Sequence, residues 1–381
     1  MFWEKEGKLI YSYDGETVCI EAWGKDALRV RATKNRSFTG RDWALEAKDA
    51  HAGEVEIFED PSAKGGAFAN MYEGTDTSYG KITNGKLHAV IDSGSVITFY
   101  HEDGRVLLKE HFRRLRDEES MPLNIMGREY SNGVGDNFRI VARFVARKGE
   151  KIFGMGQYQQ HELDLKGCML ELAQRNSQVS VPFYLSSIGY GFLWNNPGVG
   201  QVMFANNGTE WVTESGKEID YLVIAGDTPA EIEENYMTLT GKPPMMPEYG
   251  MGFWQCKLRY WNQEQLLSVA RKYKELGVPL DVIVVDFFHW TKQGEFKFDP
   301  KYWPDVPGMC RELKEMGIQV VVSVWPTVDI YSENFEEMKE KGYLVRTEHG
   351  VPLTMLCGGN EVFFDATNPD ARTYVWEKIM K

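Results

Sequence analysis

The chain has little of what would place it in a membrane, on nucleic acid or in a disulfide scaffold. Its 381 residues include only five cysteines, which are scattered and form no CxxC pair, so reduced thiols are predicted rather than disulfides or a zinc site. No run of 18 or more apolar residues occurs, and no transmembrane helix is predicted. The formal net charge of −13 argues against nucleic acid or an anionic membrane as a partner.

The sequence also gives no sign of a targeting segment or of a cofactor. Residues 1–10 lack a basic start followed by an apolar stretch, so no signal peptide is expected. Together with the unpaired cysteines, this predicts a cytoplasmic protein. No histidines stand at ligand spacing around the candidate site described below, and we expect no metal and no cofactor.

The first half of the chain alternates apolar and polar residues over short spans broken by Gly, Asn and Asp. Residues 87–91 and 96–100 predict a hairpin around a turn at 92–95. Many short strands at such spacing predict an antiparallel β-sandwich. We interpret 154–157, Gly-Met-Gly-Gln, as a loop that lacks the Lys and the helix of a phosphate-binding loop.

A well-marked helix ends this region. Thr228 as N-cap, Pro229 at the first helical position and Glu231 in a capping box predict a helix from 229 to about 239. Gly241 stops it, and three prolines within 242–247 exclude both helix and ladder pairing. We therefore predict a β-sandwich domain at 1–241 and a second domain at 242–381.

From residue 248 on, apolar strands alternate with amphipathic helices. The expected strands are 249–256, 281–287 and 318–325, and the expected helices are 263–276, 308–316, 334–341 and 371–381. This order predicts parallel pairing with right-handed crossovers. The helix after Asn262 is expected to bury Leu266, Val269, Ala270, Tyr273 and Leu276.

Only part of a barrel fits into this region. The residues from Pro247 on number about 135, whereas a closed (β/α)8 barrel needs about 250. The fold class predicted is thus an all-β sandwich followed by α/β, namely the first three strand–helix units of an incomplete TIM barrel. We expect the chain to be the front part of a longer polypeptide.

The stretch Asp281–Trp290 holds the candidate site. Four β-branched residues, 282–285, predict a strand buried on both faces, and Asp286 follows directly, ahead of four aromatic residues. Chemistry in such barrels lies at the carboxyl ends of strands. A carboxylate among rings fits a sugar subsite, whereas the alternative is an Asp that caps the next turn beside core aromatics. These ten residues alone leave both interpretations open.

Several motifs, taken in order, resemble those of glycoside hydrolase family 31, the retaining α-glucosidases and α-xylosidases. In the first domain they are residues 176–185, 190–196, 227–229 and 240–243. In the second domain they are GFWQ at 252–255, VDFF at 285–288, FD at 298–299 with WPD at 303–305, VWP at 324–326 and DATNP at 365–369. Their order and spacing make the resemblance specific, and it implies an N-terminal β-sandwich before a (β/α)8 barrel.

The resemblance implies roles at the sugar subsite −1. Asp286 matches the carboxylate that hydrogen-bonds sugar hydroxyls, Phe288 matches an aromatic lining residue, and Trp325 would form another wall. Arg259 lies near a family position that contributes to the pocket.

Two neighbouring residues are given lesser roles. We expect His289 to orient a neighbour rather than to act as a base, and Trp254 to pack in the barrel core.

The residues that break the glycosidic bond are not expected in this chain. Retaining hydrolysis needs two carboxyl groups about 5–5.5 Å apart. In the family the nucleophile follows the fourth barrel strand and the acid/base comes later, so the resemblance places both beyond Lys381. We therefore expect Asp286 to hold the sugar and the chain alone to be inactive.

Phe287 and Phe288 bear on the choice of sugar. The resemblance places them where family α-glucosidases carry a small aliphatic residue and a second Asp. Rings there would fill the space of the glucose C6 hydroxymethyl group, which xylose lacks, and such a group shifts discrimination by a few kcal/mol at most. The prediction is a glycosidase acting on terminal α-xylosyl residues of oligosaccharides, with α-glucosidase as the alternative.

Two other classes stay open. One is a non-catalytic carbohydrate-binding protein, and a more distant one is an unrelated barrel enzyme such as an isomerase. The predicted partner is an oligosaccharide substrate, with no nucleic acid and no membrane; a homo-oligomer of the full-length protein stays open.

Overall fold

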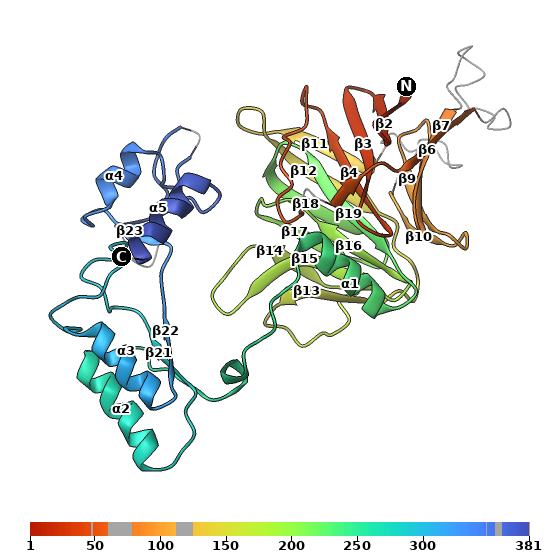
Figure 1. The fold of residues 1–381 in the computed structure, drawn as a ribbon. Coiled ribbons are helices and arrows are strands. Elements are labelled where there is room, and N and C mark those ends of the chain that lie inside the picture. The colour runs from red at the N-terminus through yellow and green to blue at the C-terminus, as the bar shows by residue number, and fades with distance from the viewer. Residues whose placement is uncertain (47–48, 60–77, 112–124, 348, 355–359, 381) are drawn as a thin grey trace. The chain divides into compact units, whose positions relative to one another are not determined.

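The computed structural model describes residues 1–46, 49–59, 78–111, 125–347, 349–354 and 360–380. The chain divides into two compact units, Met1–Pro243 and Pro244–Lys381, called here the sandwich unit and the barrel unit (Figure 1). The division lies two residues after Gly241, where the predicted first domain ends.

The described part of the sandwich unit contains three antiparallel sheets. Sheet A has the order β1-β2-β3-β4-β19-β16-β15-β13, with β5 beside β3. Its strands are β1 Phe2–Lys5, β2 Lys8–Tyr13, β3 Glu16–Trp23, β4 Ala27–Thr33, β5 Ala50–His51, β13 Ile152–Gln157, β15 Val179–Ser186, β16 Tyr190–Trp194 and β19 Ile219–Ala225.

The other two sheets have five strands each. Sheet B has the order β10-β9-β8-β7-β6 and sheet C the order β11-β12-β18-β17-β14. The strands of sheet B are β6 Glu54–Glu59, β7 Ser78–Asn84, β8 Leu87–Ile91, β9 Ile97–His101 and β10 Val106–Lys109. Those of sheet C are β11 Arg128–Asn132, β12 Phe138–Phe144, β14 Met169–Leu172, β17 Gly200–Phe204 and β18 Thr209–Gly216.

Alternation along the strands creates the sandwich core. In β8 every second residue is buried, and β8 pairs with β9 in the hairpin predicted from the sequence. The core between sheets A and C is rich in aromatic side chains. The centroid of the Phe192 ring lies 5.2 Å from that of the Trp211 ring and 5.2 Å from that of the Tyr221 ring. Large rings supply most of the buried apolar area here.

The prediction of a loop at 154–157 is wrong, because these residues belong to strand β13. The strand pairs with β15 and carries a bulge between Gly154 and Gly156. A Cβ at Gly156 would lie 2.2 Å from the Val179 carbonyl oxygen, and Gly156 has φ +90°. The glycine therefore serves a close approach of two backbones rather than a turn.

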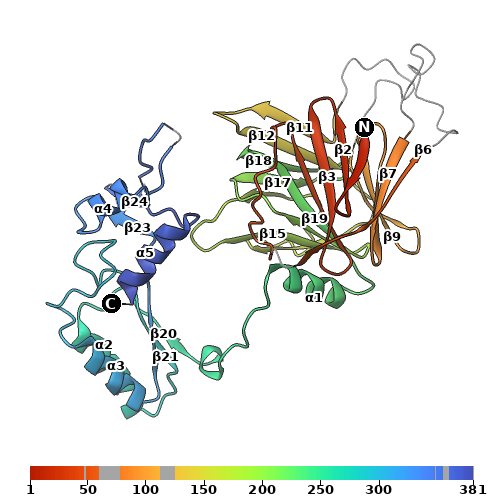
Figure 2. The same cartoon turned by 45° about the horizontal axis from the view of Figure 1, so that its top comes forward.

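Helix α1 (Pro229–Thr240) covers the outer face of sheet A (Figure 2). The Glu231 N–H donates to the Thr228 hydroxyl at 3.2 Å, as the predicted N-cap requires. The Tyr236 ring stacks on Phe183 of β15 at 3.8 Å. The predicted helix is confirmed, with one further residue at its end.

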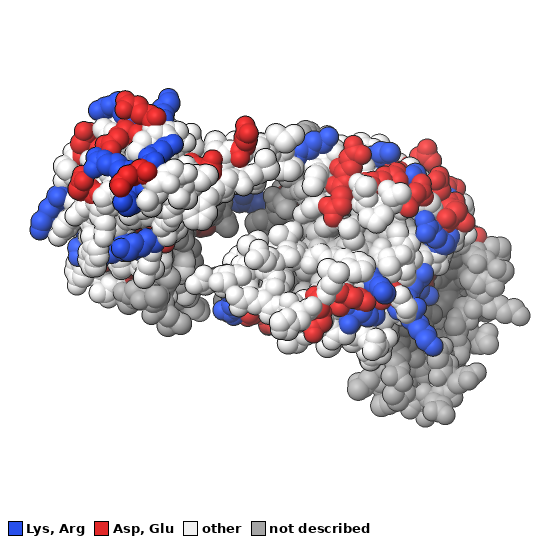
Figure 3. All heavy atoms as spheres, turned by 90° about the horizontal axis from the view of Figure 1, so that it is seen from below, with Lys and Arg blue, Asp and Glu red and all other residues white. Residues whose placement is uncertain are grey.

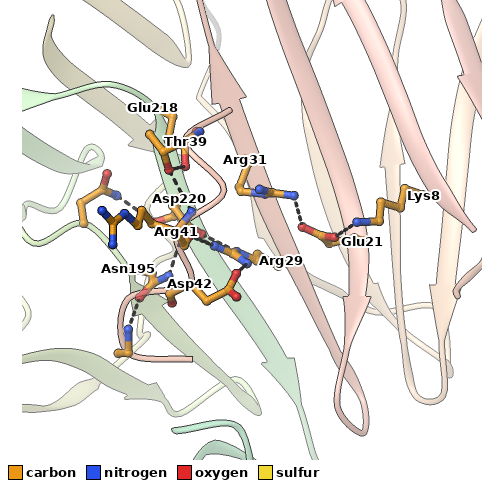
Figure 4. A network of polar contacts seen from close by, with 12 residues as sticks. Lys8, Glu21, Arg29, Arg31, Thr39, Arg41, Asp42, Asn195, Glu218 and Asp220 are labelled. Carbon is orange, nitrogen blue, oxygen red and sulfur yellow. Dashed lines mark hydrogen bonds and ion pairs between the residues drawn. The ribbon is translucent and has the colours of Figure 1, made fainter. Parts of the chain in front are cut away.

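A buried ionic network fixes the irregular segment 34–46 to sheet A (Figure 4). Arg29 of β4 forms two hydrogen bonds to Asp220 of β19, 2.9 Å and 2.7 Å long, and a third to Asp42 at 2.8 Å. Both Arg29 and Asp220 are fully buried. Burial raises the pKa of Asp220 to about 6, although the Arg29 guanidinium lowers it.

The barrel unit begins with a 3-10 helix and a small parallel sheet of order β20-β21-β22. Its elements are η2 Glu248–Met251, β20 Trp254–Gln255, α2 Gln263–Glu275, β21 Val282–Val285, α3 Val306–Glu315, β22 Gln319–Val322, β23 Thr327–Asp329, α4 Phe335–Glu340, β24 Glu361–Phe363 and α5 Pro369–Ile379. Parallel pairing is confirmed, whereas the strand predicted at 249–256 is wrong over its first half, which forms η2.

Helices α2 and α3 pack on one face of this sheet. Leu266 and Ala270 of α2 and Leu313 of α3 are fully buried in the same cluster as Ile283 of β21. Leu276, predicted to be buried, is 63% exposed because α2 ends at Glu275 and Leu276 is its C-cap.

The surface shows no continuous basic area on the face drawn in Figure 3, where acidic and basic side chains are interspersed. Within the described residues, no helix is both long and apolar enough to cross a bilayer. The same residues include no group of three or more His, Cys, Asp or Glu side chains arranged to hold a metal ion.

Candidate functional site

The parallel register brings the residues that follow β20 and β21 to one edge of the small sheet. Gln255 pairs with Ile283, and Cys256 and Asp286 each come directly after their strands. The Cys256 thiol lies 3.7 Å from Asp286 Oδ2. Partial burial and the neighbouring Asp286 carboxylate raise the pKa of Cys256, so at neutral pH the protonated thiol donates to that carboxylate.

Asp286 is partly exposed and forms no ion pair with any residue that the structure describes. Its Oδ1 accepts the Phe287 backbone N–H at 2.8 Å, which is the turn-capping contact that the alternative interpretation anticipated. A carboxylate has about four acceptor positions, and these two contacts occupy only part of them. Asp286 can therefore cap its turn and still accept hydrogen bonds from hydroxyl groups of a ligand.

Aromatic rings that contact one another follow Asp286. The Phe287 ring lies 3.9 Å from Phe288 and 5.4 Å from Trp325, nearly parallel to the latter at 9°. Phe288 has φ +66°, which is unfavourable for a bulky residue, and its side chain is 46% exposed. Strained backbone that presents an apolar ring to solvent is a feature of binding sites.

Arg259 extends the stack on the other side. Its guanidinium lies 4.0 Å from the Trp261 ring centroid and 5.0 Å from that of Phe288. Its Nε is buried and has no hydrogen-bond partner among the described residues. The stacked guanidinium thus adds a positive charge beside the exposed rings of Trp261 and Phe288.

The five residues predicted from the sequence therefore lie together. Ring contacts connect Arg259, Phe288, Phe287 and Trp325 in that order, and Asp286 precedes Phe287 in the chain. The set offers flat apolar faces beside an acceptor carboxylate and a donor guanidinium, which is the chemistry that a pyranose requires.

His289 and Trp254 differ in how well their predicted roles fit. His289 is buried and its Nδ1 donates to the Asp286 carbonyl oxygen at 3.0 Å, so it supports the turn that carries the carboxylate. Burial lowers the pKa of His289, which keeps its ring neutral. The prediction that Trp254 packs in the barrel core is wrong. Among the described residues β20 pairs only with β21, and the Trp254 side chain is 45% exposed.

Sequence reasoning missed Cys256 and Trp261 as neighbours of the site. The rule that selected Asp286, position directly after a parallel strand, applies equally to Cys256. Trp261 follows no strand, and only the stacking of Arg259 on its ring shows that it belongs to the cluster.

Family models match both units. Residues 17–202 match the glycosyl hydrolase 31 N-terminal galactose mutarotase-like domain, and residues 243–381 match the glycosyl hydrolases family 31 TIM-barrel domain. The chain belongs to glycoside hydrolase family 31. The predicted sandwich followed by a partial TIM barrel is thereby confirmed.

Relatives within family 31 include named enzymes. The chain is 42% identical over 389 residues to an uncharacterised family 31 glucosidase of Pseudescherichia vulneris, covering 99% of this chain and 70% of that protein. It is 29% identical over 385 residues to α-xylosidase A of Aspergillus niger, covering 96% of this chain and 50% of that protein.

A solved structure from the same family is similar to this chain along its whole length. A family 31 α-xylosidase from a soil metagenome, complexed with xylose, is 46% identical and superposes with a TM-score of 0.87, covering 100% of this chain and 55% of that one. The chain thus spans about half the length of two of these three proteins and 70% of the other. Its family is one of glycosidases.

Proposed function

We propose that this chain forms the sugar-holding part of a retaining α-xylosidase, with Asp286 as the carboxylate that binds the xylosyl unit at subsite −1. The observation that carries the proposal is the row of contacting rings Phe288, Phe287 and Trp325 beside a carboxylate that has acceptor positions to spare. Two relatives named α-xylosidase, one of them complexed with xylose, support the choice of sugar.

The work of Asp286 would be to strengthen binding as the reaction proceeds. A glycosidic bond breaks through an oxocarbenium-like transition state, and hydrogen bonds to the sugar hydroxyls strengthen in that state. An ionised carboxylate accepts such bonds better than a neutral oxygen. Arg259 would place a positive charge beside the Phe288 ring, where it can attract the oxygen atoms of a substrate.

The two bond-breaking carboxyl groups would come from polypeptide outside residues 1–381. Asp286 serves as a binding group in this proposal and as neither nucleophile nor acid/base. The purified chain 1–381 is accordingly expected not to hydrolyse an aryl α-xyloside, and measurable turnover by it would contradict this assignment.

The choice of xylose rests on Phe287 and Phe288. Their rings are in contact at 3.9 Å and would occupy the space that a C6 hydroxymethyl group needs. α-Glucosidase is the second candidate, because the Pseudescherichia vulneris relative is named a glucosidase.

The decisive assay compares kcat/KM for an aryl α-xyloside and an aryl α-glucoside in the full-length protein. We expect a preference for the xyloside of roughly 10- to 200-fold, since one group of this size is worth about 1–3 kcal/mol. A double change, Phe287→Ile with Phe288→Asp, should reduce or reverse that preference. Trp3→Leu, which alters an exposed ring on β1 of the sandwich unit, is the control and should leave the ratio unchanged.

A preference for the glucoside in the unaltered protein would instead establish the second candidate. A ratio that the double change leaves untouched would show that these rings do not select the sugar. The cytoplasmic location and the oligomeric state of the full-length protein stay predictions, to be tested by cell fractionation and light scattering.

A further inference from the structure

A pocket of about 290 Å³ opens within the sandwich unit, formed entirely by its own residues. It lies where β3 of sheet A and β11 of sheet C come together with the turn between β8 and β9. Its size is close to the lower end of the ~300–1,000 Å³ that ligand pockets occupy.

The floor of this pocket is a buried ionic group. Arg128 donates from Nε and Nη2 to the two oxygens of Glu16, at 3.0 Å each. Its Nη1 donates to Glu110, and its Nη2 also reaches the Ser95 hydroxyl at 2.6 Å. The Arg128 and Glu110 side chains are 4% and 1% exposed.

The group carries one more carboxylate than it has cations. Tyr130 and Tyr221 donate hydroxyl hydrogen bonds to Glu16 and Glu110, at 2.9 Å and 3.1 Å, and help to hold the excess charge. Burial raises the pKa of Glu110, although Arg128 lowers it. Apolar residues of similar volume often stabilise a protein as well as or better than such a group does. Its presence at the base of an open pocket is better explained by a ligand than by stability.

The wall is aromatic on one side. Tyr13 lines the pocket with a ring that is 54% exposed. That ring lies nearly parallel to the ring of Tyr11, with the two centroids 6.3 Å apart, and Tyr11 in turn stacks on Phe2 at 4.1 Å. A flat, rigid ring above charged acceptors suits a ligand with one apolar face and several hydroxyl groups.

We propose that this pocket binds a neutral saccharide unit, as a second sugar site separate from the one at Asp286. Sugar hydroxyls can donate to the carboxylates of Asp14 and Glu129, which line the pocket and whose side chains are 78% and 41% exposed. Four acidic residues line the pocket against two basic ones, which disfavours an anionic ligand. The site needs no residue of the barrel unit and does not depend on the proposed hydrolytic function.

The test is a binding measurement on the full chain in which Asp286→Ala removes the sugar contact of the barrel unit. Saturation-transfer NMR with D-xylose, D-glucose and methyl α-D-xyloside detects weak binding. We expect at least one of these sugars to bind the Asp286→Ala chain. A further Tyr13→Ala change should weaken that binding about 2- to 13-fold, because ring stacking contributes about 0.5–1.5 kcal/mol beyond burial.

The matched control is Trp3→Ala, which removes another exposed ring from the adjacent strand β1 without touching the pocket lining. It should leave the signal unchanged. Absence of sugar binding by the Asp286→Ala chain at about 50 mM ligand would overturn the proposal, as would binding that Tyr13→Ala does not weaken. Binding of Ca²⁺ or methylammonium in place of the sugars would also overturn it and would assign the excess carboxylate to a cation.

Discussion

The two units bury similar strands in different ways. β19 of the sandwich unit is buried along all of its residues, because sheet C packs on one of its faces and α1 on the other. β22 of the barrel unit has the sequence Gln-Val-Val-Val, yet Val321 and Val322 are each 36% exposed. Within the described residues β22 pairs only with β21, and its sheet is covered by helices on one face.

This difference shows that a run of apolar residues indicates burial in the complete fold rather than burial in any one part of it. β-branched residues in succession indicate a strand that is buried on both faces of the complete fold. In the sandwich unit both faces of β19 are covered, and the apolar pattern and the burial agree. In the barrel unit the pattern belongs to a TIM barrel of which the chain forms a part, so the burial is incomplete.

The largest expected loss of stability comes from breaking the buried ion pair between β4 and β19 of the sandwich unit. Arg29→Met should lower the free energy of unfolding of the sandwich unit by about 3–5 kcal/mol, because it leaves Asp220 buried without its cation. Hydrogen exchange of the β4 and β19 amides in urea measures this unit separately from the other. Arg139→Met is the control: Arg139 pairs with Glu214 on the surface of the same unit, and losing that pair should cost no more than about 1 kcal/mol. Equal losses of unfolding free energy for both changes would show that the buried ion pair matters no more than the exposed one.

A pair of alanine changes tests the two faces of the barrel sheet. Ile283→Ala should cost about 2–5 kcal/mol, because Ile283 is fully buried against α2 and α3. Val322→Ala should cost less than about 1 kcal/mol in this chain, because a third of the side chain is already in solvent. Hydrogen exchange of the β21 amides in urea measures the loss of stability for each of the two variants. A loss at Val322 as large as that at Ile283 would show that this face is covered.

His289 predicts a pH dependence for the barrel unit alone. Burial lowers its pKa in the folded state, so the unfolded chain takes up the proton first as the pH falls below about 6.5. The stability contributed by the neutral ring is therefore present above that pH and lost below it, by up to about 1.4 kcal/mol per pH unit. Urea unfolding at pH 7.5 and 5.5 should show the loss, and His289→Gln should reduce it. An unchanged slope in the variant would assign the titration to another group.

The smallest effect has the opposite sign. Phe288→Gly removes a non-glycine residue from φ +66° and should leave the barrel unit unchanged or more stable by about 1 kcal/mol. In the full-length protein the same change should weaken sugar binding, since the exposed ring is lost. A clear loss of stability would show that the Phe288 ring packs for structure rather than for a ligand.

Local patterns predicted much of the fold. Thr228, Pro229 and Glu231 fixed the start of α1, and the parallel pairing followed from the order of strands and helices. The bulge at Gly154 and Gly156 was not predictable, because it depends on the approach of β15, which lies more than twenty residues away in the chain. The strand start predicted at 249 and the strand end predicted at 325 were also wrong, since apolar residues continue beyond the paired positions.

The site was predictable where it follows a strand and not where it depends on packing. Asp286 was found from the strand-end rule, and the ring contacts then placed Phe287, Phe288 and Trp325 with it. The Cys256 contact and the unpaired Arg259 Nε are properties of three-dimensional neighbours, which the spacing of residues does not encode.

The most direct test of the central claim is a crystal structure of the full-length protein soaked with xylose. The account predicts a sugar ring against Phe288 and Trp325, with an Asp286 carboxylate oxygen within about 2.5–3.0 Å of a sugar hydroxyl. A xylose bound at the active centre with Asp286 turned away from it, or engaged in an ion pair instead, would contradict the account.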